Sequence, residues 1–247
     1  MEVVPGSRVV HVWSIWLNAP ASVNREYRNL LSQIEKERAD RFVFEHLTRS
    51  HELSHGALRL LLAHILSCRA QEVEFIYGPR GKPFLQGDSR IKFNMAHSGN
   101  LALYAVTFDV EIGVDVEEMR EVPDMDQIAA RYFCDAEAEE LRALGAGGPA
   151  MQAFFRCWTR KEAYIKAMGD GLYIPLDQFQ VTLSSSEPVK FVHIGKDEGV
   201  ATRWALHHLD PAPGYIGALA YLDAPRKVHF HQTVTPEQLL AQIGGNC

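Results

Sequence analysis

The sequence predicts an α+β fold in which two similar α/β halves are related by a pseudo-twofold, each a small antiparallel sheet packed on a long helix. Segments with strand-like alternation are interleaved with segments of helical periodicity, and no linker-like stretch separates them. A faint internal echo supports two halves, since Arg41-Phe-Val-Phe44 and Arg131-Tyr-Phe133 each accompany a long predicted helix. We expect the halves to comprise residues 1–110 and 111–247.

The first half begins with a predicted strand at residues 9–17, a segment rich in Val, Ile and Trp. Helical periodicity runs from Val23 to about Phe44 and again from Ser50 to Cys68. Short strands joined by turns complete this half, and the pattern places them at residues 73–77, 83–85, 91–95 and 101–108.

The second half opens on a predicted strand at residues 111–117. Two helices follow, one at residues 126–144 that ends in a glycine-rich stop and one at residues 152–168. Further short strands are predicted at residues 179–183, 189–194, 202–209 and 215–222, with a small helix near the end of the chain.

Composition narrows the class of protein. The 247 residues are 47% hydrophobic and 23% charged, which is typical of a globular domain and excludes a disordered, collagenous or coiled-coil chain. The net charge of −6 argues against a broad nucleic-acid surface. No signal-peptide pattern, membrane-length apolar run or C-x-x-C pair occurs. We therefore expect a cytoplasmic protein without nucleic-acid or membrane partners.

The first motif that could carry chemistry is Gly113-Val-Asp-Val-Glu117. On a strand, Asp115 and Glu117 project from one face about 7 Å apart. Two carboxylates this close repel each other unless a cation lies between them or one binds a proton. Gly113 on the same face is expected to leave room for a ligand. A solvated, acidic strand end would have the same pattern, so this motif alone does not decide between the two.

The second motif lies on the helix predicted at residues 152–168. Trp158, Glu162 and Lys166 recur there at i, i+4 and i+8, so they share one face. A surface Glu–Lys pair worth about 0.3 kcal/mol explains the same spacing.

The third motif combines a turn and a strand end. Gly81 and Pro83 present Lys82 in a way that suits a phosphate, and His97 precedes Ser98-Gly99 where backbone N–H groups can bind an anion. His97 could equally be structural. A Ser–His hydrolase is excluded because sequence neighbours do not readily form a nucleophile–base pair.

Two histidines near the end of the chain could form part of a metal site. His229 and His231 would lie on one strand face, but no third ligand is near them in the sequence, and a surface strand explains them as well.

Taken together and in this order, these segments resemble the 4′-phosphopantetheinyl transferase superfamily, in its larger, monomeric group, which activates surfactin-type synthetases and includes the human enzyme. The resemblance runs from about Glu35 to Gly171. The family pattern G-x-D-x-E is present as residues 113–117 and W-x-x-K-E-A as residues 158–163, with Lys166 at the second lysine. The two acidic motifs, about 45 residues apart and preceded by G-K-P and H-S-G, make this combination highly specific.

The resemblance implies transfer of the 4′-phosphopantetheine arm of coenzyme A to a serine of an apo acyl or peptidyl carrier protein, with release of 3′,5′-ADP. Such carriers serve fatty acid, polyketide and nonribosomal peptide synthesis. A hydroxyl that attacks the β-phosphorus of a pyrophosphate needs a cation across the phosphates. Asp115, Glu117 and Glu162 would bind Mg²⁺, with Mn²⁺ as the alternative ion. Glu162 would also be the general base toward the serine, and Lys166 would neutralise charge on the departing ADP phosphate.

The resemblance also implies a set of coenzyme A contacts. Lys82, His97 and Lys166 should contact its phosphates, and Arg38 matches the family's N-terminal phosphate-binding position. Residues 1–110 would then carry most coenzyme A contacts, and residues 111–247 the metal and catalytic residues. The family has a serine directly before the histidine where this chain has Ala96, so one phosphate hydrogen bond is either missing or made by a neighbour such as Ser98.

The sequence also offers a candidate region for docking of the carrier protein. The region after Asp124 and ahead of Arg131-Tyr-Phe133 is a candidate for a mobile docking flap, because it falls between the metal-binding strand and the catalytic helix.

Two alternatives use the same residues differently. A metal-dependent coenzyme A or nucleotide pyrophosphatase would cleave coenzyme A with water and no carrier. A non-catalytic module would hold the carrier or coenzyme A, with binding indifferent to Mg²⁺. The intact set of Asp115, Glu117, Glu162 and Lys166 favours the transferase.

Overall fold

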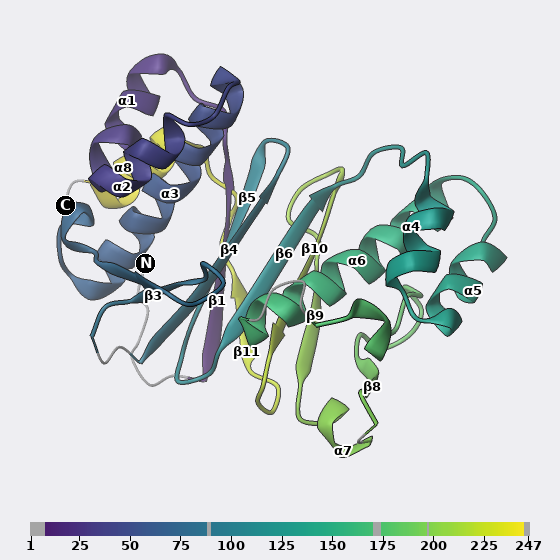
Figure 1. Cartoon of the computed structure of the whole chain (residues 1–247). Coiled ribbons are helices and arrows are strands. Elements are labelled where there is room, and N and C mark those ends of the chain that lie inside the picture. The colour runs from purple at the N-terminus through teal and green to yellow at the C-terminus, as the bar shows by residue number, and fades with distance from the viewer. Residues whose placement is uncertain (1–7, 88–89, 170–173, 197, 245–247) are drawn as a thin grey trace.

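Two β-sheets lie at the centre of the molecule, and helices cover the outer face of each (Figure 1). This computed structural model describes residues 8–87, 90–169, 174–196 and 198–244. The first sheet has the strand order β11 (Lys227–Phe230), β1 (Val9–Trp16), β5 (Leu101–Phe108) and β4 (Ile91–Ser98). The second sheet consists of β6 (Ile112–Glu118), β10 (Tyr215–Tyr221) and β9 (Ala205–Leu209), in that order. Neighbouring strands are antiparallel except for the parallel pair β1 and β11.

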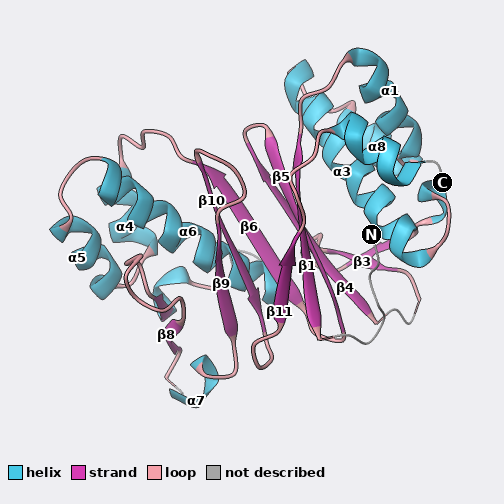
Figure 2. Cartoon of the chain, turned by 180° about the vertical axis from the view of Figure 1, so that it is seen from behind, coloured by secondary structure: helices cyan, strands magenta, loops and turns pink. Residues whose placement is uncertain are grey.

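The helices form an outer layer on each side (Figure 2). The first sheet is covered by α1 (Ala21–Leu30), α2 (Gln33–Ala39), α3 (Glu45–Leu66) and α8 (Pro236–Ile243). The second is covered by α4 (Met125–Tyr132), α5 (Asp135–Ala143) and α6 (Gly148–Met168). The remaining elements are the strand pairs β2 (Phe75–Tyr77) with β3 (Pro83–Leu85) and β7 (Phe179–Val181) with β8 (Phe191–Ile194), the short helix α7 (Glu198–Ala201), and single 3₁₀ turns at Ala70–Glu72 and Leu176–Gln178. The predicted α+β class with small, largely antiparallel sheets is confirmed.

Strand alternation decides which side chains meet which layer. On β6, Ile112, Val114 and Val116 point into the apolar layer between the two sheets. The intervening residues therefore face the opposite way, toward α6. Asp115 and Glu117 therefore point toward α6, the helix that carries the W-x-x-K-E-A segment. The alternation of residues along the strand predicts this orientation.

Two long predicted helices are each broken into two shorter ones. The helix expected at residues 23–44 is interrupted where Leu31 is extended and Ser32 caps α2, with Glu35 completing a capping box. The helix expected at residues 126–144 is interrupted at Phe133, and Cys134 begins α5 with a similar reciprocal pattern that involves Glu137. In both cases the carboxylate three residues after the cap satisfies a backbone N–H that a continuous helix would pair internally.

Gly113 sets the distance between β6 and α6. A Cβ atom at this position would collide with the carbonyl oxygen of Ala163 and the backbone nitrogen of Ala167, and would lie 3.0 Å from the Ala167 Cα. The expectation that Gly113 leaves room for a ligand was therefore wrong, because the backbone of α6 fills that space. This close approach is what brings the side chains of α6 within reach of those on β6.

We expect Gly113→Ala to lower the free energy of unfolding by about 1–3 kcal/mol, since the added methyl group forces the helix away from the strand. Chemical denaturation of the purified variant measures this loss. Gly148→Ala is the matched control, because no heavy atom lies within 4 Å of its added Cβ. It should stay within about 0.5 kcal/mol of the parent. Equal stability of the two variants would contradict the packing role of Gly113.

The last part of the described chain returns to the first sheet. Strand β11 pairs with β1, and Leu239 and Ile243 of α8 belong to the same apolar core as the helices α1 and α3. The Tyr27 hydroxyl donates a hydrogen bond to the Pro236 carbonyl at 2.9 Å. The core beside the first sheet therefore contains residues from both ends of the sequence, while the division at residue 110 stays a prediction. Among the helices described, none is long and apolar enough to cross a membrane.

Candidate active site

A buried carboxylate on β6 meets a lysine on α6. The Nζ atom of Lys166 lies 2.6 Å from Oδ1 of Asp115, a residue that is only 4% exposed. The other carboxylate oxygen, Oδ2, is buried and has no hydrogen-bond partner among the residues that the structure describes. Glu162 lies one helical turn before Lys166 on the same face of α6. One oxygen of Asp115 is thus neutralised, and the second is left to bind something else.

The three predicted metal ligands influence one another electrostatically. Burial raises the pKa of Asp115 to about 7; Lys166 opposes this rise, and Glu162 and Glu117 add to it. Burial and the charge of Glu117 also raise the pKa of Glu162, again against Lys166. The three carboxylates therefore lie near enough to affect one another's protonation, while a shared metal site stays a prediction.

Ser98 orients the third carboxylate. Its hydroxyl donates a hydrogen bond of 2.7 Å to Oε2 of Glu117 and accepts one of 3.1 Å from the Glu118 backbone N–H. Ser98 thereby joins β4 to β6. The sequence suggested Ser98 only as a substitute phosphate contact, and a link between strands 19 residues apart in the sequence could not be read from its local pattern.

Three predicted phosphate-binding residues line one cavity of about 370 Å³. Arg38 comes from α2, His97 from β4 and Lys166 from α6. The guanidinium of Arg38 lies 4.5 Å from the centre of the Tyr77 ring, which also lines the cavity. Ala96 is another lining residue, so the position that differs from the family pattern faces the same space.

The fourth predicted phosphate contact, Lys82, is placed differently. Its ammonium is buried and donates to the carbonyls of Ile112 at 3.3 Å and Ala167 at 3.1 Å, and to Oε2 of Glu111 at 3.1 Å. Lys82 thus ties the 78–83 turn to the end of α6 and the start of β6. A contact between Lys82 and coenzyme A stays a prediction.

Lys161, the other lysine of the W-x-x-K-E-A segment, lies away from this cavity. It is fully buried and pairs with Glu137 of α5 at 2.7 Å. Its ammonium also donates to the carbonyls of Leu176 and Phe179, at 2.7 and 2.6 Å. Helical spacing predicts that Lys161 points about 100° away from Lys166 around the helix, and the observed position of Lys161 agrees. No pattern in the sequence indicates Glu137 as its partner.

The carboxylates fit a hard divalent cation by their chemistry. Asp115 has a buried oxygen without a hydrogen-bond partner among the described residues, and the charges of Glu162 and Glu117 act on this carboxylate. Oxygen donors of this kind are what Mg²⁺ prefers. In the part of the chain that the structure describes, no three His, Cys, Asp or Glu side chains are arranged so that they could hold a metal ion. Lys166 supplies the cationic partner of Asp115 here.

The histidines near the end of the chain have an unexpected neighbour. His11 of β1 is in register with His229 of β11, and its Nδ1 lies 3.1 Å from Nε2 of His231. The sequence showed only the pair on β11. Across the described ranges these imidazoles are not arranged as a three-ligand metal site.

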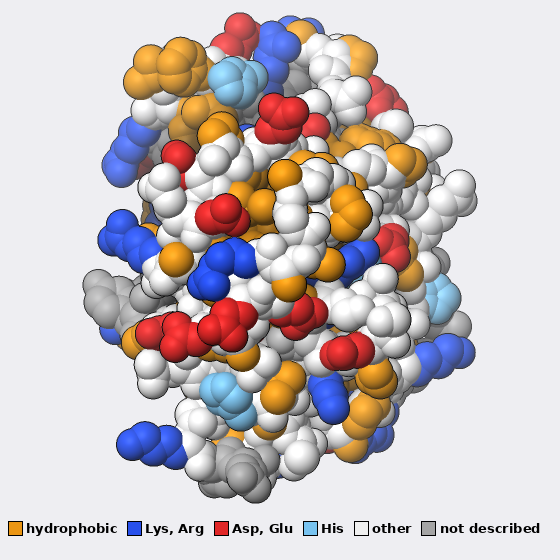
Figure 3. All heavy atoms as spheres, turned by 90° about the vertical axis from the view of Figure 1, so that its right-hand side faces the viewer, with side chains coloured by type: hydrophobic (Ala, Val, Ile, Leu, Met, Phe, Trp, Pro, Cys, Tyr) orange, Lys and Arg blue, Asp and Glu red, His pale blue; other side chains and the backbone are white. Residues whose placement is uncertain are grey.

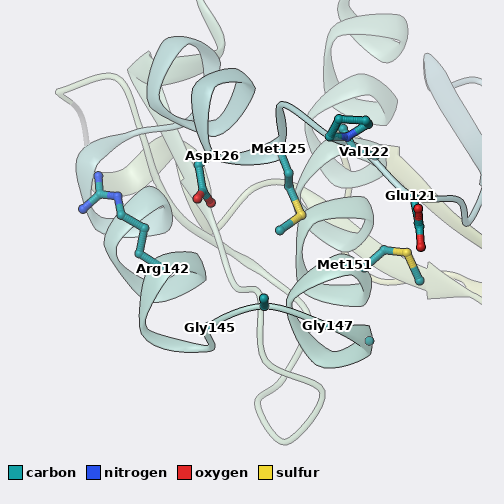
Figure 4. Close-up of a pocket in the computed structure, with 11 residues that line it drawn as sticks. Glu121, Val122, Met125, Asp126, Arg142, Gly145, Gly147 and Met151 are labelled. Carbon is teal, nitrogen blue, oxygen red and sulfur yellow. The ribbon is translucent and has the colours of Figure 1, made fainter.

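A larger cavity of about 720 Å³ lies between the segment after β6 and the start of α6. Its apolar lining residues are Val122, Pro123, Met125, Ala146 and Met151. Met125 lies between Asp126 and Glu121 and points toward the glycine-containing segment at residues 145–147 (Figure 4). The face that carries α4 and α5 shows hydrophobic side chains bordered by acidic and basic ones (Figure 3).

Comparisons with known proteins identify the family. The family model described as the 4′-phosphopantetheinyl transferase superfamily matches residues 111–220, and a model of a 4′-phosphopantetheinyl transferase N-terminal region matches residues 16–108. Together they span both motif-bearing parts of the chain.

Individual relatives give the same result. The 4′-phosphopantetheinyl transferase HetI of Nostoc sp. is 37% identical over 85% of this chain and 86% of its own length. The 4′-phosphopantetheinyl transferase of Bacillus subtilis is 30% identical over 70% of this chain and 76% of its length. The human L-aminoadipate-semialdehyde dehydrogenase-phosphopantetheinyl transferase is 28% identical over 68% of this chain and 55% of its length.

Proposed function

Because the chain belongs to the 4′-phosphopantetheinyl transferase superfamily, we propose that it transfers the 4′-phosphopantetheine arm of coenzyme A to a serine of an apo carrier protein in a Mg²⁺-dependent reaction. The serine oxygen forms a bond to the β-phosphorus, the bond to the bridging pyrophosphate oxygen breaks, and 3′,5′-ADP leaves. The observation that carries the proposal is the meeting of Asp115, Glu162 and Lys166 beside a cavity lined by Arg38 and His97.

Each side chain of the site has a task in this reaction. Arg38 and His97 bind phosphate oxygens in the cavity, and Lys166, at its edge, neutralises charge that develops on the ADP phosphate. Glu162 accepts the proton of the serine hydroxyl. Its raised pKa brings its basicity closer to neutrality, where a general base is most effective.

Asp115, Glu117 and Glu162 would hold the divalent cation, Mg²⁺ or Mn²⁺, since carboxylate oxygens suit both ions. When bound, the ion neutralises charge on the pyrophosphate. Ser98 holds Glu117 in place, and the unpartnered oxygen of Asp115 supports this assignment.

Labelling of apo carrier proteins with a fluorescent coenzyme A tests the proposal. We expect label on the carrier and release of 3′,5′-ADP when Mg²⁺ is present, and neither after chelation. A panel of fatty-acid, polyketide and peptide-synthetase carriers identifies the pathway that is served. Cleavage of coenzyme A without any carrier would indicate a pyrophosphatase instead. Coenzyme A binding that is indifferent to Mg²⁺, with no labelling, would indicate a binding module.

The carrier is proposed to dock over the 720 Å³ cavity beside α4. The cavity includes Met125, at the start of the flap region predicted after Asp124, and Val122 and Pro123 just before it add apolar surface. The net charge of −6 makes an apolar patch more suitable than global attraction for partners that are commonly acidic around the modified serine.

We expect Met125→Asp to raise the KM for the carrier about tenfold or more and to leave the KM for coenzyme A unchanged, because a charge is placed in an apolar contact. Steady-state kinetics with each substrate varied in turn separates the two constants. Val192→Asp, at an exposed apolar residue on β8, is the control. An equal effect of the two substitutions on the carrier KM would place docking elsewhere.

A further inference from the structure

Two histidines on α3 have buried ring nitrogens that bond to nothing. His51 and His55 are one helical turn apart, and their ring centres are 3.9 Å from each other. Within the described ranges, Nε2 of His51 and Nδ1 of His55 are both buried without a hydrogen-bond partner. Buried polar atoms are rarely left in this state, because an unpaired buried donor or acceptor loses its hydrogen bond to water without replacement. The pair therefore has unused capacity for hydrogen bonding.

His55 lines the same 370 Å³ cavity as Arg38, His97 and Lys166. The titratable and charged groups around the histidine pair are Glu35 and Arg38 from α2, Glu52 and Arg59 from α3, Tyr77 from β2, His97 from β4 and Lys166 from α6.

The two acids near the pair are already engaged. Glu35 pairs with the buried Arg59 at 2.7 Å, and Glu52 pairs with Arg28 at 2.5 Å. Besides Glu35, which Arg59 neutralises, the charged side chains that line the cavity are Arg38 and Lys166, and Lys166 is paired with Asp115. This lining suits an anionic ligand.

Without such a ligand the histidines are held neutral. Burial lowers the pKa of His55 well below its usual range, and the nearby His51, His97, Arg59 and Arg38 lower it further. The pKa of His51 is lowered mainly by burial, and that of His97 by burial, Lys166 and His51. A phosphate in the cavity reverses the sign of the local field, since an opposite charge within about 4–6 Å favours the protonated imidazole.

We propose that His55, together with His51, is a phosphate-binding group of this cavity that is neutral in the free protein and takes up a proton from solvent when coenzyme A binds. The N–H that His55 gains on protonation donates to a phosphate oxygen, and the adjacent ring of His51 helps to stabilise the positive charge. The inference rests on the proposed function, because coenzyme A supplies the phosphates.

The sign of the pH dependence follows from linkage. The groups bind more protons in the complex than in the free protein, so affinity rises as pH falls through the window between the two pKa values. The lower limit of that window is the pKa of His55 in the free protein, which lies below the ordinary histidine value of about 6.5. Within it the Kd for coenzyme A increases up to about tenfold per pH unit for one proton taken up. Above the window the contribution of His55 is lost.

Titration calorimetry of the purified protein with coenzyme A at pH 7, in Pipes and in Tris, measures proton uptake from the difference in buffer ionisation heat. We expect the parent to take up more protons than His55→Gln, by about 0.5–1 per site. His55→Gln should bind more weakly at pH 6 and equally well at pH 8.5. Titration of coenzyme A itself is common to all variants and cancels in the comparison.

His193→Gln is the matched control, because His193 on β8 also has a buried, unpartnered Nδ1 but does not line the cavity. Dephospho-coenzyme A forms a second arm. If the extra proton uptake is lost with dephospho-coenzyme A, the 3′-phosphate is the group that His55 binds. If the extra uptake is retained, His55 binds the pyrophosphate.

Equal proton uptake by the parent and His55→Gln, with equal melting temperatures, would overturn the inference and leave the proposed function intact. Failure of the parent to bind coenzyme A at any pH would overturn the proposed function as well.

Discussion

Asp115→Asn is expected to lower kcat/KM for carrier labelling by about 10³-fold or more, because a preorganised charge at the reacting phosphates is worth several kcal/mol. Asn keeps the shape of the side chain but removes the negative charge from the buried oxygen that has no partner. Transfer is followed as fluorescent label on the carrier and as 3′,5′-ADP released.

The Asp115→Asn variant should stay folded. It removes a carboxylate that burial already destabilises, and Lys166 remains 30% exposed, so water can solvate its ammonium when the partner is lost. Asp109→Asn is the matched control: Asp109 also pairs with a cation, the exposed Arg90, but outside the site. Its kcat/KM should stay within about twofold of the parent. Transfer by Asp115→Asn at the parental rate would mean that the site is misassigned.

Glu137→Ala is expected to cost about 3–5 kcal/mol of unfolding free energy, because it leaves the buried ammonium of Lys161 without a counter-charge. The carboxylate of Glu137 also accepts hydrogen bonds from the backbone N–H groups of Cys134 and Val181, at 3.0 and 2.8 Å. One side chain thus joins α5, α6 and β7. Differential scanning calorimetry should show a melting temperature lower by on the order of 10 °C.

Glu139→Ala provides the comparison for this second variant, since Glu139 lies two residues further along α5 and is exposed. Its stability should change by less than about 0.5 kcal/mol. If Glu137→Ala unfolds at the parental temperature, Lys161 is either deprotonated or neutralised by another group, and the structural role assigned to the ion pair is wrong.

The faces on which the acidic residues lie could be predicted, because each is set by the residue spacing within one strand or one helix. Alternation on a strand places Asp115 and Glu117 on one face, and helical spacing places Glu162 and Lys166 on another. The strand's apolar residues had to face the core, so its acidic face had only α6 to meet. Arg38 and His97 needed the family resemblance as well, because no local pattern brings α2 and β4 to one cavity.

The remaining features depend on contacts between distant residues. Glu137 looks like any acid in the first turn of a helix, and only the fold shows that it meets Lys161. The ammonium of Lys82 donates to backbone carbonyls of β6 and α6, and only the fold shows that α6 ends beside the start of β6. The breaks at Ser32 and Cys134 left the periodicity of their helices nearly intact, so a pattern of apolar residues could not reveal them.

The return of β11 and α8 to the first sheet affects how the chain can fold during translation. Strand β1 emerges from the ribosome well before β11, which is one of its two neighbours, and the apolar core beside β1 is closed by Leu239 and Ile243. At about 5–20 residues per second, synthesis of the residues between β5 and α8 takes several seconds or more. During that time the nascent first sheet exposes one long edge and part of an apolar face, so this interval is when the polypeptide most needs a chaperone.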